Sequence, residues 1–136
     1  MDLTANKALV TRYYTDVLSG RDLDALGELL AEDFTSWLSD GTPVGPGPYR
    51  EAVAVSHRAF PDLEVTVLDQ IAEGDKVVTR WRADGTHAGP FAGIPATGRP
   101  VSVTAIHVHR VAGGRLAEHW EALDLLGLMR QLGAIA

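Results

Sequence analysis

The chain lacks cysteine, and this absence removes several kinds of chemistry at once. None of its 136 residues is a cysteine, so disulfides, thiol nucleophiles and cysteine-ligated zinc or iron–sulfur centres are excluded. Long hydrophobic runs are also absent, since no apolar stretch approaches the roughly 20 residues that a membrane-spanning helix needs. The first residues, 1–4, show neither the basic region nor the apolar region of a signal peptide. We therefore expect a cytoplasmic protein with no membrane partner.

Positive charge is scarce as well. Twelve Lys and Arg face eighteen Asp and Glu, which gives a net charge of -6. Nucleic-acid-binding proteins present a basic face, so we expect no nucleic-acid partner. The remaining composition, 46% hydrophobic and 22% charged, is that of an ordinary globular chain. Its length predicts one domain over residues 1–136, large enough to bury a core. The reactive groups that remain are five histidines, carboxylates and hydroxyls, which favour acid–base chemistry or binding.

The first half of the chain has the periodicity of helices. Apolar residues recur at helical spacing over residues 4–18, which predicts an amphipathic helix that ends at Gly20. Asp22 is placed to cap a second helix. A third helix is expected from near Pro48 to just before Pro61, because proline is tolerated in a first turn but ends a helix at the residue before it.

The second half changes to the alternation of strands, followed by one short helical segment at 125–132. The alternating segments are residues 63–70, 77–87, 101–110 and 115–123. Helices followed by strands predict an α+β fold, in which the N-terminal helices pack on a strongly curved antiparallel sheet. Such a cone has an open end and a concave face suited to a small molecule. Ile106, Val108 and Trp120 alternate onto the outer face, which predicts a homodimer through that face.

Four candidate residues share faces on two neighbouring strands. His107 and His109 lie on one face of the third strand, and His119 and Glu121 on one face of the fourth. If these strands pair through the intervening glycine turn, His107 lies near His119 or Glu121, depending on the register. A histidine beside a carboxylate in a pocket is a device for moving protons, although histidines with only structural hydrogen bonds give the same pattern. The spacing matches no metal-binding helix motif, so we expect no metal site.

Several further residues are candidates for contact with a substrate. Trp37, Trp81 and Phe91 would suit a pocket for an aromatic molecule, and they would suit the core equally well. His87 lies at a strand end, where either a turn or a pocket role fits. Asp124 precedes the last helix, so it is expected to be an N-cap or a pocket residue.

An ordered set of motifs extends over nearly the whole chain. The motifs are Phe60-Pro61-Asp62-Leu63, the glycine- and proline-rich segment 85–95 with His87 and Phe91, His107-Val108-His109-Arg110, the segment 114–121 that ends Glu118-His119-Trp120-Glu121, and the segment 124–133. This set resembles the SnoaL-like polyketide cyclases, the ester cyclase group within the NTF2-like superfamily.

The resemblance implies a cone-shaped NTF2-like fold with a deep pocket and an activity in secondary metabolism. The best-known members close the last ring of anthracycline precursors by an intramolecular aldol reaction without a cofactor. Their acid–base aspartate falls on Glu121 here, so a glutamate replaces it and reaches about one methylene further. Their assisting histidine falls on His107. His119 is expected to contact the substrate together with His87, Trp37, Trp81, Phe91 and Asp124.

Two other functions stay open at this point. One is a hydrolase or isomerase of the same superfamily, in which a carboxylate activates water beside a pocket arginine. Arg80 and Arg82 alternate with Trp81, which predicts that they face away from the pocket. The other is a non-catalytic module that binds a small ligand in the same cone. We expect a lyase- or isomerase-type enzyme that acts by proton transfer on a hydrophobic, polyketide-like molecule, with no cofactor.

Overall fold

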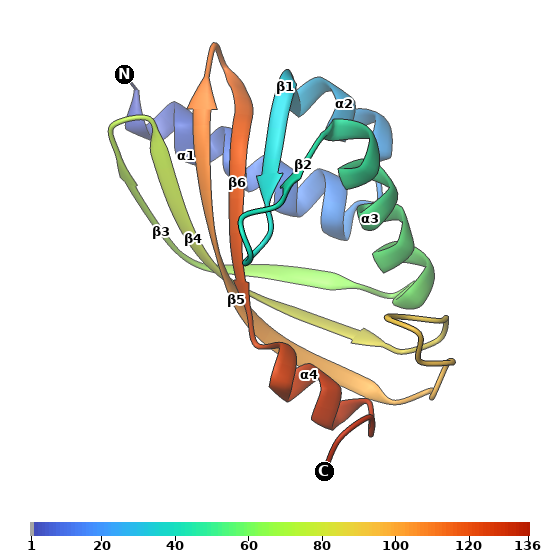
Figure 1. Cartoon of the computed structure of the whole chain (residues 1–136). Helices are drawn as coiled ribbons and strands as arrows, with labels where there is room; N and C mark the ends of the chain where they lie inside the picture. Colours follow the sequence, from blue (N-terminus) through green and yellow to red (C-terminus); the bar gives the residue numbers. More distant parts are fainter. Residues whose placement is uncertain (1) are drawn as a thin grey trace.

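The computed structural model describes residues 2–136, and its helices lie on one side of a six-stranded sheet (Figure 1). In chain order the elements are α1 (Leu3–Arg12), the π-helix η1 (Tyr13–Ser19), α2 (Leu23–Leu29), β1 (Leu30–Trp37), β2 (Pro43–Val44), α3 (Pro46–Ala59), β3 (Glu64–Glu73), β4 (Lys76–Thr86), β5 (Pro100–Ala112), β6 (Arg115–Leu123) and α4 (Leu125–Gln131). None of the described helices is long and apolar enough to cross a membrane.

The sheet has the strand order β2-β1-β6-β5-β4-β3 and bends strongly around the helices (Figure 1). Its pairings are antiparallel except that β1 runs parallel to β6. Helix α4 lies against β5 near one end of the sheet. The predicted α+β cone is therefore confirmed.

Strand β1 was not predicted from the sequence. Its alternation is broken, because Phe34 and Ser36 are buried while Glu32 and Asp33 are exposed. The pairing with β6 also has an irregularity between Leu30 and Thr35. A parallel partner lies far away in the chain, so local periodicity carries little information about it. Strand β1 matters for the site because it sets Ser36 opposite His119.

The N-terminal helix widens where it enters the cone. After Arg12 its hydrogen bonds become π-helical, and the last one joins the Gly20 N–H to the Thr15 carbonyl over 2.9 Å. A π-turn places five residues in one hydrogen-bonded loop and often lies near a functional site. Tyr13 and Tyr14, the first two residues of η1, are both buried.

The segment after β4 packs against the end of α3. The N–H groups of Ala88 and Gly89 both donate to the carbonyl of Ala59. Any side chain at Gly89 would collide with the carbonyl of Arg58, so only glycine allows this approach. The contact brings Phe91 beside Phe60, with their ring centroids 5.4 Å apart. Helix α3 itself begins at Pro46, slightly earlier than predicted, with Gly45 as its N-cap.

Candidate active site

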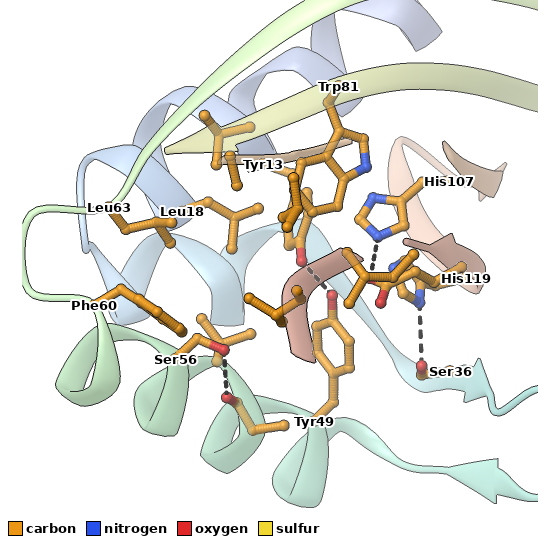
Figure 2. Close-up of a pocket in the computed structure, with 18 of the residues that line it drawn as sticks. Tyr13, Leu18, Ser36, Tyr49, Ser56, Phe60, Leu63, Trp81, His107 and His119 are labelled. Atoms are coloured by element: carbon orange, nitrogen blue, oxygen red, sulfur yellow. Dashed lines mark hydrogen bonds and ion pairs between the residues drawn. The ribbon is translucent and has the colours of Figure 1, made fainter. Parts of the chain in front are cut away.

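A cavity of about 410 Å³ lies between the concave face of the sheet and the helices (Figure 2). This volume is within the range of pockets that bind small molecules. Most of its wall is apolar or aromatic. Five polar side chains form what we call the polar end of the cavity: Tyr13, Tyr49, His107, His119 and Glu121. The tyrosine and histidine rings of this set lie close together, and the ring centroids of His107 and His119 are 4.3 Å apart.

The strand register selects the partner of His107. The pairing of β5 with β6 sets His107 opposite Glu121, and His109 opposite His119. The Nε2 atom of His107 lies 2.6 Å from Oε2 of Glu121. The His107 side chain is only 1% exposed, whereas that of Glu121 is 39% exposed. The carboxylate is therefore held on one side by a buried imidazole and stays accessible on the other.

A third residue fixes the orientation of the imidazole. The hydroxyl of Tyr14 lies 2.8 Å from Nδ1 of His107. Burial raises the pKa of Tyr14 far above its ordinary value, so its phenol stays neutral. A carboxylate can only accept, so the proton between His107 and Glu121 is on Nε2. Nδ1 of a neutral His107 ring is then the acceptor for the Tyr14 O–H. Tyr14, His107 and Glu121 thus form one directed chain of hydrogen bonds.

The other two histidines of the concave face are held neutral. Burial, with a smaller contribution from the nearby His107, lowers the pKa of His109 and of His119 well below the usual value. Ser36 contacts Nδ1 of His119 over 3.1 Å. Nε2 of His119 and Nδ1 of His109 are buried and have no hydrogen-bond partner among the described residues.

These three histidines also offer a test of metal binding. Ring nitrogens of His107, His109 and His119 lie within 4.8 Å of one another. Both nitrogens of His107 are already engaged, one by Tyr14 and one by Glu121. Only two of the three rings retain an unpartnered nitrogen, fewer than the three protein ligands of a typical catalytic zinc site. The arrangement as it stands suits a hydrogen-bond network better than a metal.

The aromatic candidates lie on the cavity wall. Trp37, Trp81 and Phe91 all line it, and the rings of Trp81 and His107 are tilted against each other with 4.8 Å between centroids (Figure 2). The indole N–H of Trp37 donates to Oε1 of Glu118 over 3.2 Å. The indole N–H of Trp81 is buried and has no partner among residues 2–136.

Two other candidates are placed away from the cavity, whose wall among the described residues includes neither His87 nor Asp124. His87 is fully buried, and its Nδ1 accepts the backbone N–H of Thr97 over 3.2 Å, so it ties down the segment between β4 and β5. Asp124 caps α4 by accepting the N–H of Gly127 over 2.9 Å. Both positions are explained by local structure, and we do not retain them as substrate contacts.

The sequence did not point to the tyrosines of the site. Tyr13 and Tyr14 belong to a helical apolar stripe, which predicts core residues, and Tyr49 stands in a glycine- and proline-rich context. In the structure the hydroxyls of Tyr13 and Tyr49 hydrogen-bond to each other at the polar end (Figure 2). Burial raises the pKa of both residues. Three tyrosines on helices that face a histidine-bearing sheet are the signal that could have found them.

Comparison with known proteins assigns the family. The model of the SnoaL-like polyketide cyclases matches residues 8–132. The chain belongs to this family. A curated relative, aklanonic acid methyl ester cyclase DauD from Streptomyces sp. (strain C5), is 31% identical over 128 residues, which are 92% of this chain and 80% of DauD.

Solved structures share the fold of this chain. A protein from Jannaschia sp. CCS1 described as a SnoaL-like polyketide cyclase superposes with a TM-score of 0.89 at 31% identity, over 98% of this chain and 94% of that chain. AclR from Streptomyces galilaeus, which is described as a hydroxylase, gives a TM-score of 0.91 at 27% identity, over 99% of this chain and 100% of AclR. The predicted resemblance to SnoaL-like cyclases is therefore confirmed. Members of the family act on polyketide-like molecules, which supports an enzymatic function in general.

Proposed function

We propose that this protein closes a ring in a hydrophobic, polyketide-like molecule by acid–base catalysis without a cofactor. The observation that carries the proposal is the Glu121 carboxylate, oriented by buried His107 at the polar end of a mostly apolar cavity. In this account Glu121 is the acid–base residue and His107 orients it. His119, Trp37, Trp81 and Phe91 contact the substrate.

The proposed reaction balances without any further reactant. Glu121 removes a proton from a carbon next to a carbonyl group, and the electron pair moves onto the carbonyl oxygen to give an enolate. The enolate carbon then attacks a second carbonyl carbon of the same molecule, which forms the new C–C bond. The resulting alkoxide takes the proton back from the Glu121 carboxylic acid. Substrate and product are isomers, and nothing is oxidised or reduced.

The cavity supports a flat, apolar substrate. Its volume of about 410 Å³ and its aromatic wall suit a molecule of several fused rings. The relative DauD is named for cyclising aklanonic acid methyl ester, which supports a methyl-esterified polyketide as the substrate class. The apolar wall would hold the two reacting carbons together and exclude water from the enolate.

The two alternatives receive less support. A hydrolase of the Asp–Arg–Asp kind needs an arginine in the pocket, and Arg80 and Arg82 are instead exposed and paired with Asp69 and Asp84. A module that only binds a ligand would need the cavity, but it would not need a carboxylate oriented by His107.

The mass and the NMR spectrum of the product together separate the three functions. We would incubate the protein with a small panel of aromatic polyketide methyl esters, in the presence of a metal chelator, and analyse the mixture by mass spectrometry and NMR. Ring closure gives a product of unchanged mass, or one that has lost water. Hydrolysis would add water to the substrate or release methanol, and a binding module would return the substrate intact. Either of these last results contradicts the proposal, as does loss of activity in chelator that zinc restores.

We also propose that the chain forms a homodimer through the outer face of the sheet. The strand pairings align Ile71, Val78, Val108 and Trp120 in one row across that face. Ile106 lies beside this row and is 44% exposed. A continuous apolar row on an open sheet is a surface that a second copy would cover.

A further inference from the structure

The hydroxyls of Tyr13 and Tyr49 hold one proton more than their mutual hydrogen bond uses. Each hydroxyl has the other as its only hydrogen-bond partner among residues 2–136. Two phenols carry two protons, and a single hydrogen bond between them uses one. The second O–H has no acceptor in the described chain, although Tyr13 is 3% and Tyr49 8% exposed. A buried donor left unsatisfied is costly, so an acceptor from outside the chain is expected there.

The spare O–H lies beside the groups that we assign to the chemistry. Both tyrosines line the cavity, and their hydroxyls meet near His107 and His119 (Figure 2). The ring centroid of Tyr49 is 5.2 Å from that of His119, and the centroid of Tyr13 is 6.1 Å from that of His107. The negative charge of Glu121 also contributes to the raised pKa of both tyrosines, which is consistent with its being nearby. Both phenols therefore stay protonated, and the pair keeps one O–H to donate.

We propose that the Tyr13–Tyr49 hydroxyl pair binds the carbonyl oxygen of the substrate and stabilises the negative charge on it when the enolate forms. This assignment rests on the proposed function, because it supplies the oxygen site for the proton abstraction by Glu121. It names a catalytic pair that neither the family resemblance nor the comparisons assign.

The sequence of charges fits this role. Before the reaction, the charge lies on the Glu121 carboxylate, and the substrate carbonyl is neutral. After proton transfer, Glu121 is neutral and the charge lies on the enolate oxygen. This oxygen accepts a hydrogen bond from the spare O–H. The hydrogen bond from the tyrosine pair to the substrate oxygen is therefore stronger in the transition state than in the ground state, which is the condition for lowering the barrier. Preorganised donors of this kind are worth roughly 100- to 1000-fold in rate.

A phenol whose anion absorbs visible light tests the donor pair without any turnover. We would bind 4-nitrophenol to the Glu121→Gln variant, whose neutral amide stands in for the protonated carboxyl group. The absorbance then gives the ratio of bound anion to bound neutral phenol at a fixed pH. Tyr13→Phe and Tyr49→Phe are added to this background singly and together, because each keeps the ring and removes one hydroxyl, and in a single variant the remaining hydroxyl loses its partner and can still donate. Thr104→Val, which removes an exposed hydroxyl from β5, is the matched control.

We expect the ratio of anion to phenol to fall at least about tenfold in the double tyrosine variant and to stay unchanged in the threonine control. With natural Glu121 in place, the double variant should lower kcat about 100-fold and change KM only a few-fold. The proposal is overturned if the folded double variant keeps the parent ratio, if the probe binds with no enrichment of its anion, or if it does not bind in the cavity. If the probe's anion is enriched but the natural protein closes no ring, the assignment of the donor pair stands and only the proposed ring-closing reaction is contradicted.

Discussion

The two faces of the sheet differ in the charge of their polar side chains. On the concave face, His109 and His119 are buried and stay neutral, because burial lowers their pKa. On the outer face, charge is kept and neutralised by ion pairs such as that of Arg110 with Glu118. Strand β6 supplies a carboxylate to each face, Glu118 outside and Glu121 inside. The comparison teaches that the chemical role of a carboxylate here depends on which face of one strand it occupies.

Removing each carboxylate in turn should give the largest difference in activity between the two faces. Glu121→Gln should lower the rate of ring closure at least about 1000-fold, because the amide cannot take the proton. Glu118→Gln on the outer face should lower it less than about threefold, because the half-buried Glu118 side chain pairs with Arg110 and Trp37 and does not line the cavity. Turnover of a polyketide methyl ester measures both variants, and circular dichroism checks that they fold. Similar rates for the two variants would show that the face does not decide the role.

Loss of the Tyr14 hydroxyl should have an intermediate effect. In Tyr14→Phe, His107 loses the donor to Nδ1 and can exchange its tautomer, so the carboxylate is less well oriented. We expect kcat to fall about tenfold, with a shifted pH profile and a nearly unchanged KM. A purely structural role for Tyr14 would instead lower thermal stability and leave the pH profile of the remaining activity as it was.

The neutral histidines predict a stability that depends on pH. His109 and His119 have a lowered pKa in the folded state, so the unfolded state binds more protons once the pH falls below about 6.5. Their stabilising contribution is complete above that pH and is lost as the pH falls. Between about pH 7.5 and 5.5, the free energy of unfolding should fall by about 2 kcal/mol for the two residues together.

Urea unfolding at a series of pH values measures this slope. His109→Gln removes one of the two titrating groups and should make the slope shallower, whatever its effect on overall stability. The ion pair of Glu118, whose pKa is lowered by Arg110, does not titrate in this range. A stability that is flat over the range would mean that the histidines take up protons in the folded state as they do in the unfolded state.

The outer face should affect assembly and little else. Val108→Arg places a charge in the middle of the apolar row and should convert the proposed dimer to a monomer in light scattering. Ala8→Arg, at an exposed position on α1, is the control and should remain dimeric. Ring closure should change less than about twofold in both, because the cavity opens on the other face. A monomeric natural protein would contradict the dimer.

The sequence was informative where structure is local. Alternation on 101–110 and 115–123 was enough to put His107, His119 and Glu121 on one face, because side chains of a strand alternate regardless of what they pack against. The same reasoning could not choose between His119 and Glu121 as the partner of His107. That choice depends on the register, which has an irregularity next to the turn, between Arg110 and Val111.

What the sequence missed depends on long-range packing. Tyr14 reaches His107 across 93 positions of sequence, and Tyr13 meets Tyr49 because two separate helices face the same sheet. A helical stripe shows that a tyrosine is buried, but it does not show what its hydroxyl contacts. For His87 the strand-end position left a turn role and a pocket role open, and the side chain holds the segment between β4 and β5.

The central claim is that Glu121 removes a proton from a carbon next to a carbonyl. The most direct test is hydrogen–deuterium exchange at that carbon, followed by NMR in D2O, with an aromatic β-keto ester that cannot close a ring. The account predicts that the natural protein and Glu118→Gln accelerate the exchange, and that Glu121→Gln does not. Exchange as fast in Glu121→Gln as in the natural protein would contradict it.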